Sequence, residues 1–327
     1  MNSHSSISVI IPTRNRLESL NRVLLSIAKQ THVPKEIIIV DSSDNPLTLE
    51  QLAVQNRIQI IHSKPSVCLQ RNIGIEQSTS DYVFLCDDDI ELPEKYLEEL
   101  LVHLEKHPKT IVVSGLVYEQ QNNQWHYAEK KKSFWKLLYA SFFGLSVWSE
   151  IKKDDFSRNR LTQRFISNYL KKGNRIAKSG WPIVIDYKNP FFSTPVYSLM
   201  ASLVRKDKIK NVRFESAFYE NGIGDNYDFL IEMDSKVTVI PSLKVLHHEE
   251  KINRVPNEKA YRHRIHALHF IMLKHQRFQK VHLGYLLWSL IGKSLIFLIK
   301  GQLKLVYYNF EAIARILSNH PLYKVDH

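Results

Sequence analysis

The chain has 327 residues, 44% of them hydrophobic, which is enough for one large domain or two smaller ones with a substantial core. The formal net charge of +12 predicts an anionic partner: a nucleic acid, a phosphorylated small molecule or an anionic membrane surface. Its two cysteines, Cys68 and Cys86, exclude a disulfide framework and indicate a reducing compartment. The first residues lack a cationic segment followed by a long apolar run, so we expect no secretory signal and a cytoplasmic protein.

Strands alternate with helices over the first 118 residues. Apolar, β-branched runs predict strands at 7–11, 36–40, 59–62, 82–86 and 110–117. Helical spacing predicts helices at 17–29, at 66–77 and from Pro93 onward. This order predicts an α/β fold with a mainly parallel sheet and right-handed crossovers.

Polar clusters follow three of these strands. Pro12-Thr13-Arg14-Asn15-Arg16 follows the first strand, Asp41-Ser42-Ser43-Asp44 the second, and Asp87-Asp88-Asp89 the strand at 82–86. The carboxyl ends of parallel strands share one edge of a sheet, so we expect the clusters to converge there. Such an edge offers groups for a base and a ribose, cations for phosphates and carboxylates for a metal. Any single cluster is equally consistent with an ordinary turn or helix cap.

Three adjacent carboxylates at Asp87–Asp89 repel one another unless a cation joins them. Oxygen ligands of this kind favour Mg²⁺ or Mn²⁺, held by one or two carboxylates and the phosphate oxygens of a nucleotide. The alternative is a solvated turn that places negative charge at a helix N-terminus.

Residues 119–180 mix cations with bulky aromatic side chains and lack a regular alternation of strands and turns. This composition suits a membrane interface or a sugar-lipid acceptor. It suits a buried pair of hydrophobic helices with a charged outer face equally well.

Farther on, the pattern becomes regular again, with strands predicted at 195–204, 236–240 and 243–246, a helix start at 205–209 and a helix from about Asn226. Gly222 and Gly224 allow a tight turn that would place Asp225 near the N-terminus of that helix, facing the cleft. A capping role for Asp225 is the simpler alternative. His247, His248 and Glu249 follow the last of these strands.

The C-terminal region is helical and basic. Residues 261–278 have a helical period, and 281–300 form an apolar stretch nearly long enough to span a bilayer. Lys293 lies inside that stretch, and Gly284 and Gly292 weaken it, so we favour a helix lying in the membrane interface over a spanning helix or a core or dimer helix. Three flanking lysines favour contact with anionic lipid: Lys280, Lys300 and Lys304.

Residues 1–118, and then 187 to about 275, resemble the family 2 glycosyltransferases. The resemblance rests on eight segments in order: VIIPTRNR, IIIVDSSD, LQRNIGI, YVFLCDDDIELP, SLMASLVRKDKI, VRFESAF, GIGDNYDF and VLHHEEKINR. The family includes bacterial rhamnosyltransferases and related transferases of surface polysaccharides. It implies a GT-A (Rossmann-like) fold, with a mainly parallel mixed sheet flanked by helices and here a helical C-terminal extension.

The resemblance also implies roles for single residues. The donor would be bound by Pro12, Thr13, Arg14, Asn15, Asp41, Asp44, Arg71, Asp87 and Asp88. Within this set the first turn and Asp41 would lie against the nucleobase, Arg71 near the diphosphate and Asp87 near the ribose. Asp89 matches the carboxylate that coordinates the metal, and either His247 or His248 would complete the metal or diphosphate site.

The family usually carries Glu-Asp where this chain has Gly224-Asp225. Asp225 matches the general base, with Asp228 as a supporting acid, and the absent glutamate bears on acceptor binding. A divalent cation on the diphosphate and one base suffice for a single displacement that inverts the anomeric centre.

These observations predict a transferase domain at 1–255, with the insertion at 119–180, and a membrane-associating helical region at 256–327. The expected activity is inverting transfer of a sugar from a UDP- or dTDP-sugar to a lipid-linked or polysaccharide acceptor with Mg²⁺ or Mn²⁺. We expect the enzyme to lie on the inner face of the membrane, with homodimerisation left open. The alternatives are a nucleotidyltransferase and a non-catalytic protein that binds nucleotide sugars or other anionic ligands. Clustered acids at the crevice argue against nucleic acid.

Overall fold

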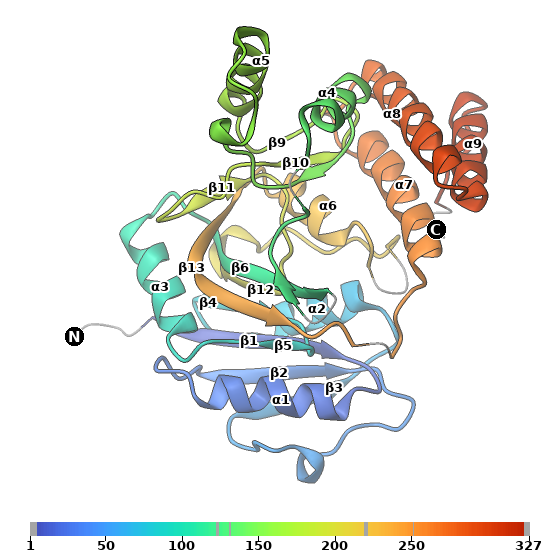
Figure 1. Ribbon diagram of the computed structural model, residues 1–327. Helices are drawn as coiled ribbons and strands as arrows, with labels where there is room; N and C mark the ends of the chain where they lie inside the picture. Colours follow the sequence, from blue (N-terminus) through green and yellow to red (C-terminus); the bar gives the residue numbers. More distant parts are fainter. Residues whose placement is uncertain (1–4, 122–123, 131, 219–221, 251, 324–327) are drawn as a thin grey trace. The chain divides into compact units, whose positions relative to one another are not determined.

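The chain combines a large mixed sheet with a set of helices that pack on one another (Figure 1). The computed structural model describes residues 5–121, 124–130, 132–218, 222–250 and 252–323. Two units emerge from its contacts. The sheet unit comprises residues 1–127, 188–193 and 197–254, and the helical unit comprises 128–187, 194–196 and 255–327.

Strands of the large sheet follow the order β11-β13-β6-β12-β4-β1-β2-β3, with β5 paired to β13 and β7 to β6. Their bounds are β1 Ile7–Thr13, β2 Glu36–Asp41, β3 Ile58–His62, β4 Tyr82–Cys86, β5 Ile90–Glu91, β6 Val112–Gln121, β7 Gln124–His126, β11 Phe192–Thr194, β12 Ala201–Arg205 and β13 Val237–His247. Strands β4, β1, β2 and β3 run parallel, as their sequence order predicts. All residues of β1 and β4 are buried, which explains their continuous apolar runs.

Helices of the sheet unit are α1 Leu17–Ala28, α2 Val67–Gln77, α3 Tyr96–Lys106 and α6 Asp225–Glu232. Helix α1 turns one apolar face to the core: Leu20, Leu24 and Ile27 are buried, and Leu17 packs against the core partly buried. The parallel strands therefore end together at one edge, and the residues after β1, β2 and β4 form the candidate site.

Four predictions from the sequence differ from the structure. Strand β12 is shorter than 195–204 and lies antiparallel between β4 and β6, because a segment distant in sequence completes the sheet. The two strands predicted at 236–246 are one strand, β13, whose pairing with β6 shifts between Ile240 and Lys244. The helix expected from Pro93 begins at Tyr96, and the predicted helix start at 205–209 is one 3-10 turn, Lys206–Lys208.

Helices of the helical unit are α4 Phe134–Phe143, α5 Arg160–Lys171, α7 Asn257–Lys274, α8 Lys280–Ile299 and α9 Leu303–Leu317. A small sheet of order β8-β10-β9 accompanies them: β8 Val147–Trp148, β9 Arg175–Ile176 and β10 Pro182–Val184. The irregular segment 119–180 thus contains two helices with a small core of their own, centred on Leu137, Ile166 and Ile183.

Gly115 in β6 provides a stability test for the centre of the sheet unit. A Cβ at this position would lie 2.4 Å from the Leu243 carbonyl oxygen and 2.6 Å from the Tyr96 ring. Because overpacking a buried site costs about 1–3 kcal/mol, Gly115→Ala should lower the free energy of unfolding by about 2 kcal/mol. Gly284→Ala on α8, where a Cβ meets nothing within 4 Å, is the control. Equal urea midpoints for Gly115→Ala and wild type would contradict this packing.

Candidate active site

The three consecutive carboxylates after β4 each have a different partner. Asp87 accepts a hydrogen bond from Arg71 Nη2 at 2.7 Å. Asp88 accepts from Thr13 Oγ1 at 2.6 Å, and Asp89 lies 3.4 Å from His247 Nε2. The acidic run therefore contacts side chains from α2, β1 and β13, which argues against a solvated turn.

Asp88 joins the acidic run to the turn after β1. Arg16 Nη1 lies 3.0 Å from Asp88 and 3.4 Å from Asp89, and its guanidinium also donates to the carbonyl oxygen of Ile252. Burial raises the pKa of Asp88 to about 7, in spite of the opposing effect of Arg16. The side chain of Asp88 thus fixes the turn through Thr13 and Arg16, and its two oxygens face these residues.

Asp89 and His247 form a buried ion pair. Burial alone would raise the pKa of Asp89, but the hydrogen bond and charge of His247 outweigh burial and lower this pKa. Burial alone would lower the pKa of His247, but its interactions with Asp89 and Glu119 raise it to about 10. In the described part of the chain, His247 Nδ1 is buried without a hydrogen-bond partner. An imidazole and a carboxylate held this way suit a divalent cation.

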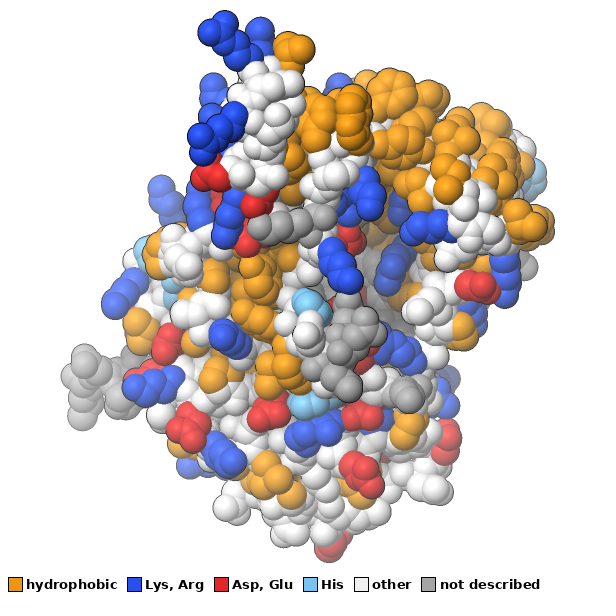
Figure 2. Space-filling view, viewed as in Figure 1, with side chains coloured by type: hydrophobic (Ala, Val, Ile, Leu, Met, Phe, Trp, Pro, Cys, Tyr) orange, Lys and Arg blue, Asp and Glu red, His pale blue; other side chains and the backbone are white. Residues whose placement is uncertain are grey.

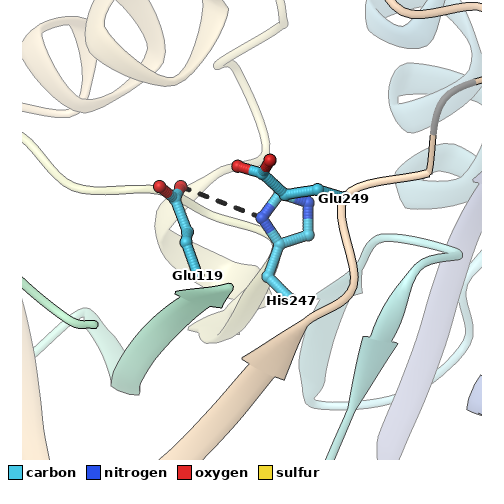
Figure 3. A group of neighbouring side chains, drawn as sticks. All are labelled: Glu119, His247 and Glu249. Atoms are coloured by element: carbon cyan, nitrogen blue, oxygen red, sulfur yellow. Dashed lines mark ion pairs between the residues drawn. The ribbon is translucent and has the colours of Figure 1, made fainter. Parts of the chain in front are cut away.

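Two more carboxylates surround His247 in the described residues. Figure 3 shows Glu119, from the end of β6, and Glu249, just after β13, pointing toward the His247 ring. Ligand atoms of the three side chains lie within 4.8 Å of one another, and Glu119 is 3.8 Å from His247 Nδ1. Glu249 has a φ of 50°, a left-handed backbone conformation that is unusual for glutamate. The donor set of this edge therefore fits a divalent metal ion.

His248 points to a different neighbour. Its Nε2 lies 3.2 Å from Glu91, and its ring meets the edge of Trp125 at a centroid distance of 5.6 Å. Neighbouring residues on a strand alternate in direction, so only one of the two histidines can face Asp89. The sequence left this choice open, and the structure places the ring of His247 beside Asp89.

Arg71 of α2 links the acidic run to the start of α6. Its Nη1 donates to Asp225 at 2.5 Å, its Nη2 donates to Asp87, and its guanidinium lies 5.2 Å from the centroid of the Phe214 ring. Burial raises the pKa of Asp225 to about 6, although the charge of Arg71 opposes this shift. A carboxylate with such a pKa is ionised at neutral pH yet basic enough to accept a proton.

The glycines before Asp225 shape the turn that positions it. Gly222 and Gly224 have φ values of 63° and 110°, a region that favours glycine. A Cβ on Gly222 would lie 2.9 Å from the Asp225 carboxylate and 2.5 Å from Val67. Asp225 is the first residue of α6, so it lies near the helix N-terminus as the sequence predicts. The N-cap residue is Gly224.

The turns after β1 and β2 also meet, as their shared sheet edge predicts. Arg14 pairs with Asp44 at 3.2 Å, and Asn15 donates to Asp44 at 2.8 Å. Asp41 lies buried and accepts hydrogen bonds from the backbone N–H groups of Ser43 and Leu47, both at 2.9 Å. Asp41 therefore shapes the turn after β2 from within.

Other residues of this edge were not singled out by the sequence. Arg16 bridges two carboxylates, Glu119 and Glu249 face His247, and Gln70 donates to the carbonyl oxygens of Thr13 and Val40. Arg16 and Glu249 had a signal, since Arg16 belongs to the polar turn after β1 and Glu249 follows the two histidines after β13. Pro12 is the penultimate residue of β1, and Asp228 is fully buried inside α6, one helical turn after Asp225.

Comparisons with known proteins identify the family and the fold. The sequence model described as Glycosyl transferase family 2 matches residues 8–171. Poly(ribitol-phosphate) beta-N-acetylglucosaminyltransferase TarP of Staphylococcus aureus (strain N315) is 25% identical over 289 residues, which cover 80% of this chain and 86% of TarP. The uncharacterized glycosyltransferase YwdF of Bacillus subtilis (strain 168) is 29% identical over 131 residues, 39% of this chain and 49% of YwdF.

A solved structure of GalNAc-T7 with UDP, GalNAc and Mn²⁺ superposes with a TM-score of 0.52 at 13% identity. The superposition covers 82% of this chain and 48% of that one. The chain thus spans about half the length of YwdF and of GalNAc-T7. The similarity to GalNAc-T7 shows a shared fold, and the predicted GT-A architecture is confirmed.

Proposed function

Because the chain belongs to glycosyl transferase family 2, we propose that it is an inverting glycosyltransferase that uses a UDP- or dTDP-sugar and a divalent metal. The acceptor is a hydroxyl of a lipid-linked or polysaccharide molecule. The observation that carries this proposal is the bridge made by Arg71 between Asp87, the first residue of the acidic run, and Asp225 at the start of α6. One cation thereby joins the proposed donor side to the proposed base.

Asp89 and His247 would hold the Mg²⁺ or Mn²⁺ ion, with the carboxylates of Glu119 and Glu249 close by. Bound there, the ion would stabilise the negative charge that develops on the nucleoside diphosphate leaving group. Metal binding requires a neutral imidazole, so the proton shared by His247 and Asp89 has to leave when the ion enters.

The rest of the donor site consists of residues along the strand ends. We assign the nucleobase to the turns that carry Arg14, Asn15 and Asp44, and the ribose to Asp87. Asp41 and Asp88 stabilise these turns by accepting buried hydrogen bonds, Asp41 from the backbone N–H of Leu47 and Asp88 from Thr13 Oγ1. Arg71 supplies the buried positive charge for the diphosphate.

Asp225 removes the proton of the acceptor hydroxyl as that oxygen attacks the anomeric carbon. Burial and a tight turn hold the carboxylate in place, and Arg71 stabilises its charged form. The displacement needs no covalent nucleophile, since the bond to the acceptor forms while the bond to the diphosphate breaks. Asp228, buried one turn later in α6, is a supporting residue.

This assignment predicts an acidic limb in the pH dependence of turnover. Asp225 has to be ionised to accept the proton, and burial raises its pKa to about 6. We therefore expect kcat/KM to be constant well above this pKa and to fall about tenfold per pH unit below it. Initial rates at saturating Mn²⁺ measure the limb, and circular dichroism at each pH separates it from unfolding. A rate that stays constant down to about pH 5 would argue against Asp225 as the base.

A screen of nucleotide sugars by thermal shift, with and without Mn²⁺, tests the proposed function. A donor that needs the metal to raise Tm identifies the nucleotide sugar, because a ligand that binds the folded state stabilises it. The same donor should then release a nucleoside diphosphate in the presence of acceptor. Release of pyrophosphate from a nucleoside triphosphate would instead favour a nucleotidyltransferase.

We place the enzyme at the inner face of a membrane, attached through its helical unit, with residues 256–327 as its membrane-associating region. Among the residues that the structure describes, α8 is the one helix long and apolar enough to cross a bilayer, with a mean hydropathy of 1.5.

A further inference from the structure

Helix α8 has an apolar side chain at most of its exposed positions. Its exposed stripe is apolar: Val281, Tyr285, Trp288, Ile291, Leu295, Leu298 and Ile299. Its packed side combines Leu286 and Leu290 with Ser289, Gly292 and Ser294, all of them buried, and only 28% of its most apolar window is buried in the protein. The exposed side of a helix in a water-soluble protein is normally polar.

The polar side chains of α8 that are buried have partners within the helical unit. Trp181 Nε1 donates to Ser289 Oγ at 2.9 Å, and Asn309 Nδ2 of α9 donates to Ser294 Oγ at 2.9 Å. Lys293 Nζ lies 3.8 Å from the centroid of the Trp181 ring, and its pKa is lowered to about 7 by burial. These contacts hold one side of α8 against Trp181 and α9. The opposite side, which carries the exposed apolar stripe, therefore lies on the outer surface of the helical unit.

Two neighbouring helices extend this stripe. Helix α9 exposes Leu303, Tyr307, Phe310 and Leu317 while it buries Asn309, and α4 exposes Trp135 and Phe142. Helix α4 packs directly on α8, because the ring of Phe143 stacks on Trp288 with a centroid distance of 4.8 Å. Figure 2 shows hydrophobic side chains gathered over α4, α8 and α9. We call this surface the apolar face; apolar residues on the surface of a water-soluble monomer are normally scattered singly.

Charge identifies the occupant of the apolar face. The helical unit contains 24 of the 45 Lys and Arg residues but only 8 of the 33 Asp and Glu residues. The sheet unit contains the other 21 Lys and Arg residues and 25 Asp and Glu residues. The positive charge of the protein therefore resides in the unit that carries the apolar face. Lys136, Lys280 and Lys300 are exposed on or next to its helices. Two copies joined through this face would bring like charges together, whereas an anionic lipid surface attracts it.

We propose that α4, α8 and α9 together form a preformed surface that embeds in the headgroup region of an anionic bilayer, without any helix crossing it. This inference rests on the proposed membrane location and specifies its surface. A spanning α8 would lose the bonds that Ser289 and Ser294 make to Trp181 and Asn309. An embedded face keeps those bonds and inserts only the outward apolar side chains.

The test is flotation of the purified full-length chain with vesicles of phosphatidylcholine, with or without about one third phosphatidylglycerol. Wild type should float with the anionic vesicles, and high salt should weaken the binding. The triple variant Ile299→Ser, Leu303→Ser, Tyr307→Ser removes three of the most exposed apolar side chains. It should bind at least about tenfold more weakly. The matched control is Leu25→Ser, Val33→Ser, two exposed positions of the sheet unit, which should bind like wild type.

Trp135 and Trp288 provide a second readout on the same surface. Their fluorescence should shift to the blue on binding and be quenched by lipids brominated near the headgroup more than by lipids brominated near the chain ends. Equal flotation of the triple variant and wild type would overturn the proposal, as would strong quenching at the chain ends. A dimer by light scattering that the triple variant dissociates, without vesicle binding, would assign the face to a second copy. Wild-type protein that floats with anionic vesicles but turns over none of the nucleotide sugars would count against the proposed function alone.

Discussion

Replacement of Asp225 by Asn is expected to lower kcat by about 10²–10⁴-fold, the usual contribution of a positioned general base. The amide oxygen of Asn still accepts the hydrogen bond from Arg71, so the fold and the donor site should persist. It lacks the basicity to take the proton of the acceptor hydroxyl. We therefore expect the Kd of the nucleotide sugar to stay within about threefold of wild type, since the base acts on the acceptor.

Asp207→Asn is the matched control, because this aspartate belongs to the sheet unit and pairs with Lys208 on the surface. It should leave kcat and Kd unchanged. Isothermal titration with the donor measures Kd, and a coupled assay for the released nucleoside diphosphate measures kcat. Undiminished turnover by Asp225→Asn would remove this residue from the mechanism. Loss of donor binding together with turnover would assign Asp225 to the support of Arg71.

The second large effect is expected at the two neighbouring histidines. His247→Gln removes the imidazole beside Asp89 and should weaken Mn²⁺ binding by about 10–100-fold, with a parallel loss of turnover at limiting metal. His248→Gln changes the adjacent residue, whose ring meets Glu91 and Trp125, and should leave the metal affinity unchanged. Chelation with EDTA should abolish turnover by wild type, and added Mn²⁺ or Mg²⁺ should restore it.

Titration calorimetry with Mn²⁺, in the presence of the nucleoside diphosphate, measures both variants directly. Since metal binding displaces a proton from His247, the wild-type affinity should also rise with pH. The pair is informative because both substitutions are the same and one residue apart. Equal affinities of the two variants would show that His247 is not a ligand.

The parallel half of the fold could be read from the sequence because its inner strands β1 and β4 are buried on both faces. The continuous runs at β1 and β4 carry that signal, and their polar ends fix the edge where Thr13 meets Asp88. Strand β12 could not be placed in the same way. Its pairing with β4 and β6 joins residues that lie 88 to 123 positions apart in the sequence, which no local period encodes.

The candidate site could also be predicted only in part, because some of its contacts depend on strand pairing between distant segments. The acidic run, Arg71 and Asp225 stand out by residue type and by order along the chain. Which histidine faces Asp89 depends on the phase of β13, and that phase is set by its irregular pairing near Ile240. Glu119 carried no local signal, because it reaches His247 only through the parallel pairing of β6 and β13.

The domain boundaries depend on a similar long-range effect. A transferase domain at 1–255 with an insertion at 119–180 follows from the sequence, and we retain it as a proposal. By contacts, residues 128–187 group with 255–327. Hydrophobic contacts such as Phe143 on Trp288 join these two segments, and composition alone does not pair them.

Diffraction from crystals soaked with Mn²⁺ and UDP or dTDP is the most direct test of a metal-assisted transfer at these strand ends. The account predicts an anomalous peak for manganese within coordination distance of Asp89 and His247, with the diphosphate bound to the ion and near Arg71. A nucleotide bound elsewhere, or manganese density away from Asp89 with the Arg71 bridge undisturbed, would contradict it.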